Sequence, residues 1–223
     1  FMVTNPNYNP VFDSEVITIN KRIVRLTTEG AEQVYNGTAL TNANWAEDTD
    51  SEGFVTGQGF ETAATTGTIT NVGTANNGFE YTLTSATKTG NYTFDVTEGV
   101  LEITKAKTLT VDATDYSGKY DGSAHGVTAA ANFPGGTTIF YRDSYSANPA
   151  DYTLTSSPTA KNTSDSKTVY FVATNGNYEP AFGSAEITVT PRTVTIDTAD
   201  GTKVFDGTAL KAPVWTVNTT THD

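Results

Sequence analysis

The chain has 223 residues and a composition that favours β-structure, with 44 threonines and 11 each of tyrosine and phenylalanine against seven leucines and one methionine. Acidic residues outnumber basic ones by 25 to 13, and a net charge of −12 repels phosphate backbones and anionic lipid, so we expect neither nucleic acid nor a membrane surface as a partner. The lack of cysteine excludes disulfides, thiol nucleophiles and thiolate-bound metals.

The sequence is repetitive. The pattern Tyr/Phe-Asp/Asn-Gly-Thr/Ser-Ala recurs at a constant spacing, at 35–39, 120–124 and 205–209, which gives a repeat of about 85 residues. Sliding the chain along itself until residue 1 meets residue 171 aligns 1–53 with 171–223 without a gap and with 20 identical pairs, which indicates that two repeat types alternate. We therefore predict the end of a second-type repeat at 1–22, a complete first-type repeat at 23–107, a complete second-type repeat at 108–192 and the beginning of a first-type repeat at 193–223. Because the outer two are incomplete, we interpret the chain as a window cut from a longer protein.

Within each repeat, apolar residues alternate with polar ones, a pattern that predicts strands with one buried face. In chain order the clearest strands lie at 79–83, 92–96, 101–103, 109–111 and 187–189. Turn-forming residues separate them, at 75–78, 89–91, 134–136 and 175–177. About seven short strands in each repeat are typical of a small sandwich. We predict an all-β chain of tandem immunoglobulin-like β-sandwich domains, with β-grasp-like repeats as the alternative.

The junctions between repeats contain no Gly/Ser linker. The strand that ends at Ile103 is followed within a few residues by the strand that begins at Leu109, and Pro191 fixes φ in the next junction. A flexible linker would need Gly/Ser composition and length, so these junctions predict a stiff head-to-tail rod. No apolar run approaches the roughly 20 residues that a membrane-spanning helix needs, so we expect no membrane insertion.

Three elements recur together in order: the Tyr-Asp-Gly pattern, a Gly-Asn-Tyr element at 90–92 and 176–178, and a closing Ile-Thr followed by Lys or Arg. In these elements the whole chain resembles the tandem MBG/YDG-type repeats of large bacterial cell-surface, adhesin-like proteins. The resemblance implies an extracellular location, at the bacterial cell surface or cell wall, and a role as stalk or adhesin without catalytic residues. Asn36 and Phe205 depart from the Tyr-Asp-Gly pattern, so we expect this element to form a turn rather than a ligand site.

Catalytic groups are scarce, and we do not expect an enzyme. His125 and His222 are the only imidazoles, and neither lies in a nucleophile–base motif. Since the other repeats have no histidine at the position of His125, we interpret it as an exposed surface residue.

An acidic stretch offers the only candidate metal site, with calcium as the only candidate cofactor. Asp48, Asp50 and Glu52 resemble the oxygen-rich opening of a calcium loop. Gly59 stands where such a loop would require a bidentate glutamate, so we favour a solvated acidic loop.

The candidate ligand patch lies in the second-type repeat, within 140–152, where rings and polar groups that could stack on a sugar and hydrogen-bond to it are mixed. Its members are Tyr141, Arg142, Asp143, Tyr145 and Tyr152. We favour the alternative that strand alternation suggests. In it, one ring of each neighbouring pair lies in the core and the other lies on the surface. Trp45 and Trp215 occupy equivalent positions in the first-type repeats, and we expect them to pack.

Two functions are consistent with these patterns. The repeats are a mechanical spacer that holds a distal binding region away from the cell, or they themselves bind host glycans, mucin or matrix proteins with avidity from many copies. Self-assembly through the partial repeats is a third possibility; otherwise the expected partners are neighbouring repeats of the same chain. Exposure of the rings of 140–152 as one patch would favour the adhesin, and scattered burial the spacer.

Overall fold

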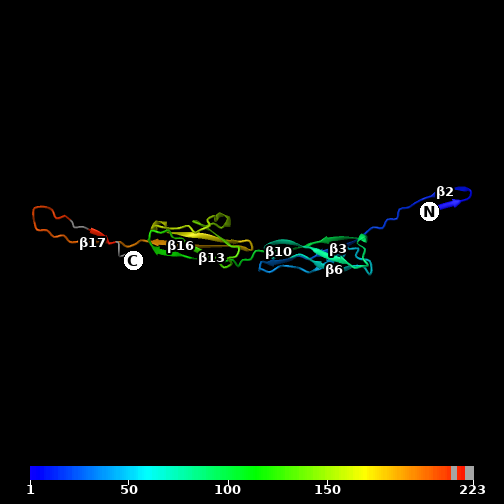
Figure 1. The fold of residues 1–223 in the computed structure, drawn as a ribbon, viewed down its shortest axis with the longest axis horizontal. Helices are drawn as coiled ribbons and strands as arrows, with labels where there is room; N and C mark the ends of the chain where they lie inside the picture. The colour runs from blue at the N-terminus through cyan, green and yellow to red at the C-terminus, as the bar shows by residue number, and fades with distance from the viewer. Residues whose placement is uncertain (212–214, 219–223) are drawn as a thin grey trace. The chain divides into compact units, whose positions relative to one another are not determined.

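The computed structural model describes residues 1–211 and 215–218, which form β-strands joined by turns (Figure 1). The chain divides into two compact units, Phe1–Lys105 and Ala106–Asp223. The all-β prediction is confirmed: besides strands, the described residues contain three short 3-10 turns and no α-helix. A β-grasp fold would pack a helix against its sheet, and this part of the chain provides none.

Unit 1 begins with a hairpin and continues with the strands of the first-type repeat. The elements are β1 (Met2–Asn5), β2 (Tyr8–Phe12), β3 (Arg22–Thr28), β4 (Ala31–Val34), β5 (Trp45–Glu47), β6 (Phe60–Thr65), β7 (Gly73–Asn77), β8 (Phe79–Leu83), η1 (Thr89–Asn91), β9 (Tyr92–Thr97) and β10 (Gly99–Thr104). Beyond the hairpin, these strands form three small sheets with the orders β5-β3-β9, β4-β10-β7 and β6-β8.

Three chain segments of unit 1 change sheet midway. Only Glu29 and Gly30 separate β3 from β4, Gly78 separates β7 from β8, and Glu98 separates β9 from β10. The two halves of each segment pair with different strands. The alternation of buried and exposed side chains keeps its phase from β7 to β8 but shifts by one residue between β3 and β4 and between β9 and β10. The change of sheet therefore lets a single long segment contribute to both layers of the unit.

The first and last strands of the first-type repeat run parallel to each other through both sheets. In the β3–β9 ladder Arg22 faces Tyr92, and in the β4–β10 ladder Val34 faces Thr104. The same offset in sequence separates the partners in both ladders, so the register is kept across the change of sheet.

A buried polar layer lies where these strands change sheet. The hydroxyl of Thr28 donates to the carbonyl oxygen of Asn77 at 2.6 Å and accepts from the amide nitrogen of Gly99 at 2.9 Å. The side chain of Asn77, fully buried, donates to the carbonyl oxygens of Glu29 and Asn42 at 2.8 and 2.9 Å. A Cβ on Gly99 would lie 2.4 Å from backbone atoms of Glu29, so glycine is required there for space. Three strands thus cross in close contact.

Apolar clusters lie on either side of this polar layer. One is rich in rings and consists of Val24, Leu26 and Tyr92 with Trp45, Phe54, Phe60, Phe79, Phe94 and Val96. The other consists of Leu40, Leu101 and Ile103 with Ala31, Tyr35, Ile69 and Val72. The ring of Trp45 lies 4.9 Å from that of Phe79 and 6.0 Å from that of Phe60, so Trp45 packs as expected.

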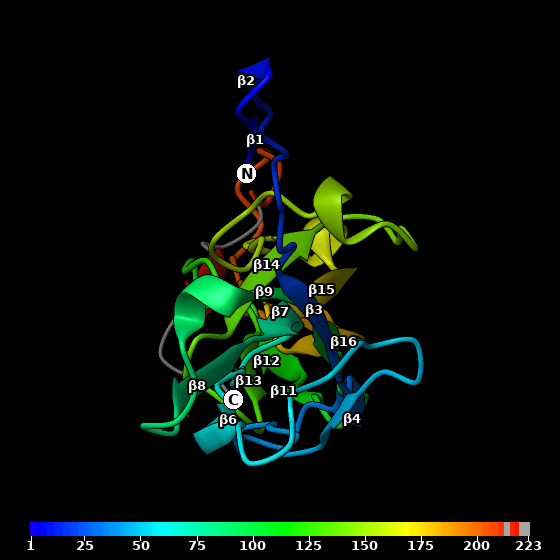
Figure 2. The same cartoon turned by 90° about the vertical axis from the view of Figure 1, so that its right-hand side faces the viewer.

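Unit 2 contains the second-type repeat and the chain that follows it. Its elements are β11 (Val111–Thr114), β12 (Tyr116–Lys119), β13 (Thr128–Ala131), β14 (Thr138–Arg142), η2 (Pro149–Asp151), η3 (Thr163–Asp165), β15 (Lys167–Asn175), β16 (Tyr178–Thr190), β17 (Thr195–Thr198) and β18 (Trp215–Asn218). A four-stranded sheet of order β12-β16-β15-β14 is accompanied by the pair β11-β13 (Figure 2). The core between them is formed mainly by Val127, Tyr141, Val169, Phe171, Ala185, Ile187 and Val189.

The hairpin of β1 and β2 repeats the geometry of β15 and β16, at the spacing predicted between successive second-type repeats. Met2 faces Phe12 as Val172 faces Phe182, and both hairpins have a register shift just before the turn. In the complete repeat, Phe171 and Val172 are buried, whereas the side chains of β1 and β2 are exposed. The last strand pair, β17 and β18, likewise has exposed side chains at its described positions, including Trp215, which is 64% exposed.

Candidate functional site

The Tyr-Asp-Gly element forms the same turn in all three copies. The side-chain oxygen of its Asp or Asn accepts a hydrogen bond from the backbone nitrogen two residues later, and the glycine between them has a positive φ. The accepting and donating residues are Asn36 and Thr38 (2.8 Å), Asp121 and Ser123 (2.8 Å), and Asp206 and Thr208 (3.0 Å). The glycines are Gly37 (φ 83°), Gly122 (φ 80°) and Gly207 (φ 76°). The element is therefore a structural turn in each copy.

A side-chain donor also reaches each turn oxygen, and its charge matches that of the acceptor. The pairs are Gln33 with Asn36 at 2.9 Å, His125 with Asp121 at 3.0 Å and Lys203 with Asp206 at 2.6 Å. A neutral amide meets a neutral amide, whereas groups that are or can become cationic meet carboxylates. The hydrogen bond from His125 is the main cause of a lowered pKa at Asp121, and the hydrogen bond from Lys203 has the same effect on the pKa of Asp206.

His125 is fixed by its neighbours rather than exposed. Its side chain is 23% exposed, and its ring stacks on that of Tyr116 at 4.1 Å. The interpretation as an exposed surface residue was therefore wrong, because the hydrogen bond with Asp121 and the stacked ring of Tyr116 hold the imidazole in place. His222 lies outside the described residues.

The acidic stretch does not gather its carboxylates around a common point. Asp48 accepts from the hydroxyl of Thr27 at 2.7 Å, Asp50 lies 3.4 Å from the guanidinium of Arg25, and Glu52 accepts from the backbone nitrogen of Ile23 at 2.6 Å. Each carboxylate thus binds a different position of β3. In the described part of the chain, no three carboxylates or imidazoles are grouped as a metal ion would need.

The five residues of the candidate ligand patch differ widely in exposure. Tyr141 is 8% exposed and contributes to the core, and Tyr152 is 4% exposed. Tyr145, in contrast, is 64% exposed, and its ring lies 6.0 Å from that of Tyr170. The rings of 140–152 therefore do not form one continuous exposed patch.

Tyr152 is buried because the loop after β14 folds over the outer face of the four-stranded sheet. Val172 lies between Phe140 and Phe182 across the strands, and alternation places these three on the face opposite to the core residue Phe171. Val172 is nonetheless fully buried, and the ring of Tyr152 packs 5.8 Å from that of Phe182. The continuous apolar run at 169–173 was the sequence signal for a sheet covered on both faces.

Polar contacts within this loop involve the remaining members of the patch. The hydroxyl of Tyr152 donates to the carbonyl oxygen of Ser146 at 2.9 Å, and the hydroxyl of Ser146 donates to Asp151 at 2.5 Å. Arg142 lies 3.2 Å from Asp151, and Asp143 lies 3.2 Å from the ammonium of Lys167. The hydrogen bond from Ser146 is the main cause of the lowered pKa of Asp151. Most of the polar side chains predicted to bind a sugar are thus engaged in holding the loop.

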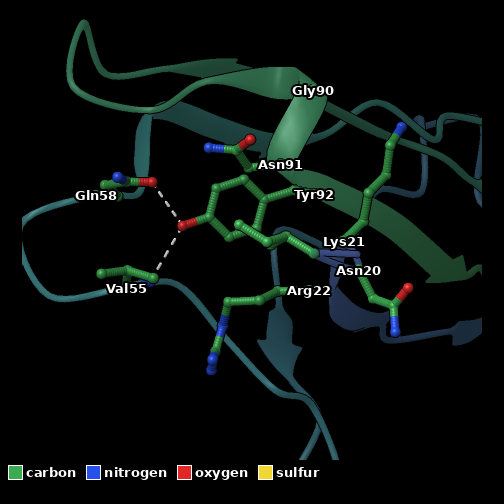
Figure 3. A pocket seen from close by; sticks show the side chains of 9 residues that line it. Asn20, Lys21, Arg22, Val55, Gln58, Gly90, Asn91 and Tyr92 are labelled. Carbon is green, nitrogen blue, oxygen red and sulfur yellow. Dashed lines mark hydrogen bonds between the residues drawn. The ribbon is translucent and has the colours of Figure 1, made fainter. Parts of the chain in front are cut away.

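Sequence reasoning missed a cavity of about 380 Å³ at the beginning of the first-type repeat (Figure 3). At its wall the hydroxyl of Tyr92 donates to the side-chain oxygen of Gln58 at 2.6 Å and accepts from the backbone nitrogen of Val55 at 3.2 Å. The guanidinium of Arg22 donates to the carbonyl oxygens of Glu52 and Gly53. The Gly-Asn-Tyr element that ends in Tyr92 was the available signal. These contacts hold a loop against β3 and β9 and present no nucleophile–base pair.

Comparisons with known proteins add little to this geometry. No family model and no curated protein sequence matches the chain. Among solved structures, it is similar to "Sidekick-1 immunoglobulin domains 1-5", with 10% identity, a TM-score of 0.29 and coverage of 78% of this chain and 42% of that one. It is also similar to "Sidekick-1 immunoglobulin domains 1-4, crystal form 1", with 11% identity, a TM-score of 0.27 and coverage of 79% and 52%. The chain spans about half the length of these structures.

Within residues 1–211 and 215–218, no helix has the length and apolar character needed to cross a membrane.

Proposed function

We propose that the chain is a stalk segment of a large bacterial surface protein, in which tandem immunoglobulin-like sandwiches form a stiff head-to-tail rod that projects a distal binding region. The proposal places the chain outside the cell, at the surface or in the cell wall, and assigns no reaction to it. Its support is the repeat pattern of the sequence together with the way in which one repeat is connected to the next.

The observation that carries the proposal is the length of that connection. The last strand of unit 1 ends at Thr104, and Ala106 is already held in unit 2, since its nitrogen donates to Asn177 at 3.1 Å and its carbonyl oxygen accepts from Glu179 at 2.8 Å. Only Lys105 lies between the two folds. A connection of one residue has few backbone dihedrals through which two domains could reorient, and it contains neither Gly nor Ser.

The stiffness of the connection can be measured as a distance distribution between the two units. Because the chain has no cysteine, Thr74→Cys and Thr138→Cys provide unique sites for spin labels on exposed positions of β7 and β14. We expect a narrow distribution for the natural connection and a broad one when a Gly/Ser segment is inserted between Lys105 and Ala106. Equally broad distributions for both proteins would refute the stalk proposal.

An adhesin role is the second candidate, and the observation in its favour is the exposure of Tyr145, whose ring lies beside that of Tyr170 and which follows Asp143 by two residues in the sequence. An exposed tyrosine can stack its ring on a sugar and hydrogen-bond to it through its hydroxyl. Binding of the full chain to immobilised glycans, mucin and matrix proteins tests this role, with Tyr145→Ala as the variant. Exposed Tyr120, which lies away from this loop in sequence, provides the control variant Tyr120→Ala. Saturable binding lost only in Tyr145→Ala would favour the adhesin.

A further inference from the structure

The strands that carry the two ends of the first-type repeat lie side by side and parallel. Its chain enters at Arg22, the first residue of β3, and leaves at Thr104, the last residue of β10. A pull on the entering end draws β3 and β4 backwards along their axis, and a pull on the leaving end draws β9 and β10 forwards. Parallel neighbours therefore slide in opposite directions, so the hydrogen bonds of the ladder are loaded together rather than one at a time.

The ladder between these strands is long and is bridged where it changes sheet. Six residue pairs connect β3 with β9, and four connect β4 with β10. At the interruption, the buried hydroxyl of Thr28 accepts from the backbone nitrogen of Gly99 at 2.9 Å, so a side chain continues the connection where the backbone ladder stops. The hydrogen bond from the nitrogen of Tyr35 to the carbonyl oxygen of Thr104, at 2.9 Å, extends it at the far end.

The second-type repeat has a shorter version of the same arrangement. Four residue pairs connect β12 with β16 in parallel, and a single parallel bridge joins Ala106 to Tyr178. Between them β11 pairs with β13 instead. Asp115, at the break between β11 and β12, accepts from the backbone nitrogen of Glu186 at 2.8 Å, as the counterpart of the Thr28 bridge.

We propose that both repeats are mechanical clamps that resist tension along the chain, and that the first-type repeat resists the higher force. This inference rests on the proposed stalk function, because a stalk that holds a bound target is pulled at its two ends. The first-type repeat has ten parallel ladder pairs between its first and last strands, whereas the second-type repeat has four pairs and one bridge. We therefore expect the first-type repeat to unfold at the higher force. Forced unfolding is governed by the unfolding rate, so resistance to load requires neither repeat to be unusually stable at equilibrium.

The test is single-molecule force spectroscopy of the full chain carrying Thr93→Cys, pulled in two directions. Thr93 is exposed and faces Ile23 at the beginning of the β3–β9 ladder. Handles at the two termini load the ladder in shear. A handle at the N-terminus and another on the introduced cysteine pull the same ladder apart from one end, pair by pair. The molecule and its equilibrium stability are identical in both geometries, so only the direction of the load differs.

We expect two unfolding events in end-to-end pulling, each releasing about 3.5 Å per unfolded residue. The stronger event is that of the first-type repeat, and its force falls severalfold when the load is applied through the cysteine. Asp115→Ala lowers the force of the weaker event only. Equal forces in the two geometries would overturn the clamp, as would a reduction of the stronger event by Asp115→Ala. Neither result bears on the distance distribution that tests the stalk.

Discussion

Replacing Thr28 by valine tests the contribution of the buried polar layer to the stability of unit 1. Valine keeps the shape of threonine, so the packing changes little while the hydroxyl is lost. The amide nitrogen of Gly99 then loses its acceptor at 2.9 Å, and the carbonyl oxygen of Asn77 loses a donor at 2.6 Å. Each buried polar group left without a partner costs about 1–3 kcal/mol, so the two groups together predict a loss of roughly 2–6 kcal/mol in the free energy of unfolding.

Urea denaturation followed by tryptophan fluorescence measures this loss. Trp45 packs within unit 1, whereas Trp215 is 64% exposed and should change little on unfolding. Thr28→Ser is the matched control, because it keeps the hydroxyl and loses only a methyl group, at a cost of about 1 kcal/mol. An unchanged midpoint in Thr28→Val, or an equal loss in both variants, would show that the hydrogen bonds do not stabilise the layer.

The other predictions concern a glycine, a pair of tyrosines and a turn. Gly99→Ala should lower the stability of unit 1 by more than about 3 kcal/mol, since its Cβ would meet backbone 2.4 Å away, whereas Gly90→Ala, with nothing within 4 Å, should be close to neutral; thermal unfolding compares them. In denaturation of unit 2, Tyr141→Ala should cost about 3–5 kcal/mol and Tyr145→Ala less than about 0.5 kcal/mol; equal losses would contradict the burial of Tyr141. Because the folded pKa of Asp121 is lowered from 3.8, its stabilisation is present above that pH and is lost as the pH falls through the lowered value; Asp121→Asn should reduce the acid dependence measured by circular dichroism.

Strand positions could be predicted from the sequence better than strand partners. The alternation at 92–96 and 101–103 correctly indicated β9 and β10, and the recurring Asp/Asn-Gly pair correctly indicated the turns. Alternation reports which face of a strand is buried and carries no information about its neighbour. The parallel pairing of the first and last strands, and the change of sheet at Glu98, therefore required the structure.

The candidate ligand patch shows the same limit at the level of side chains. Alternation allowed either ring of a pair to be buried, and the structure places Tyr141 in the core. Tyr152 lies in a loop, where no periodicity exists to predict burial, and it is covered because that loop folds over Phe182. In the sequence, the polar residues appeared free to bind a ligand. Their actual partners, such as Ser146 for Asp151 and Lys167 for Asp143, are determined by the conformation of the loop, which the sequence pattern does not reveal.

The matched donors on the three turns affect how such repeats can be recombined. In the first-type copies, donor and acceptor are three residues apart, as Gln33 with Asn36 and Lys203 with Asp206, so an exchange of this short segment moves both together. In the second-type copy the donor, His125, follows its acceptor, Asp121, and comes from the other side of the turn. A chimera that joins a first-type entry strand to a second-type turn would place both the entry-strand donor and His125 at one oxygen. The reverse fusion would lack both and keep only the donors within the turn, such as the hydroxyl of Thr38 or Thr208. Designed arrays should therefore be spliced outside the turns.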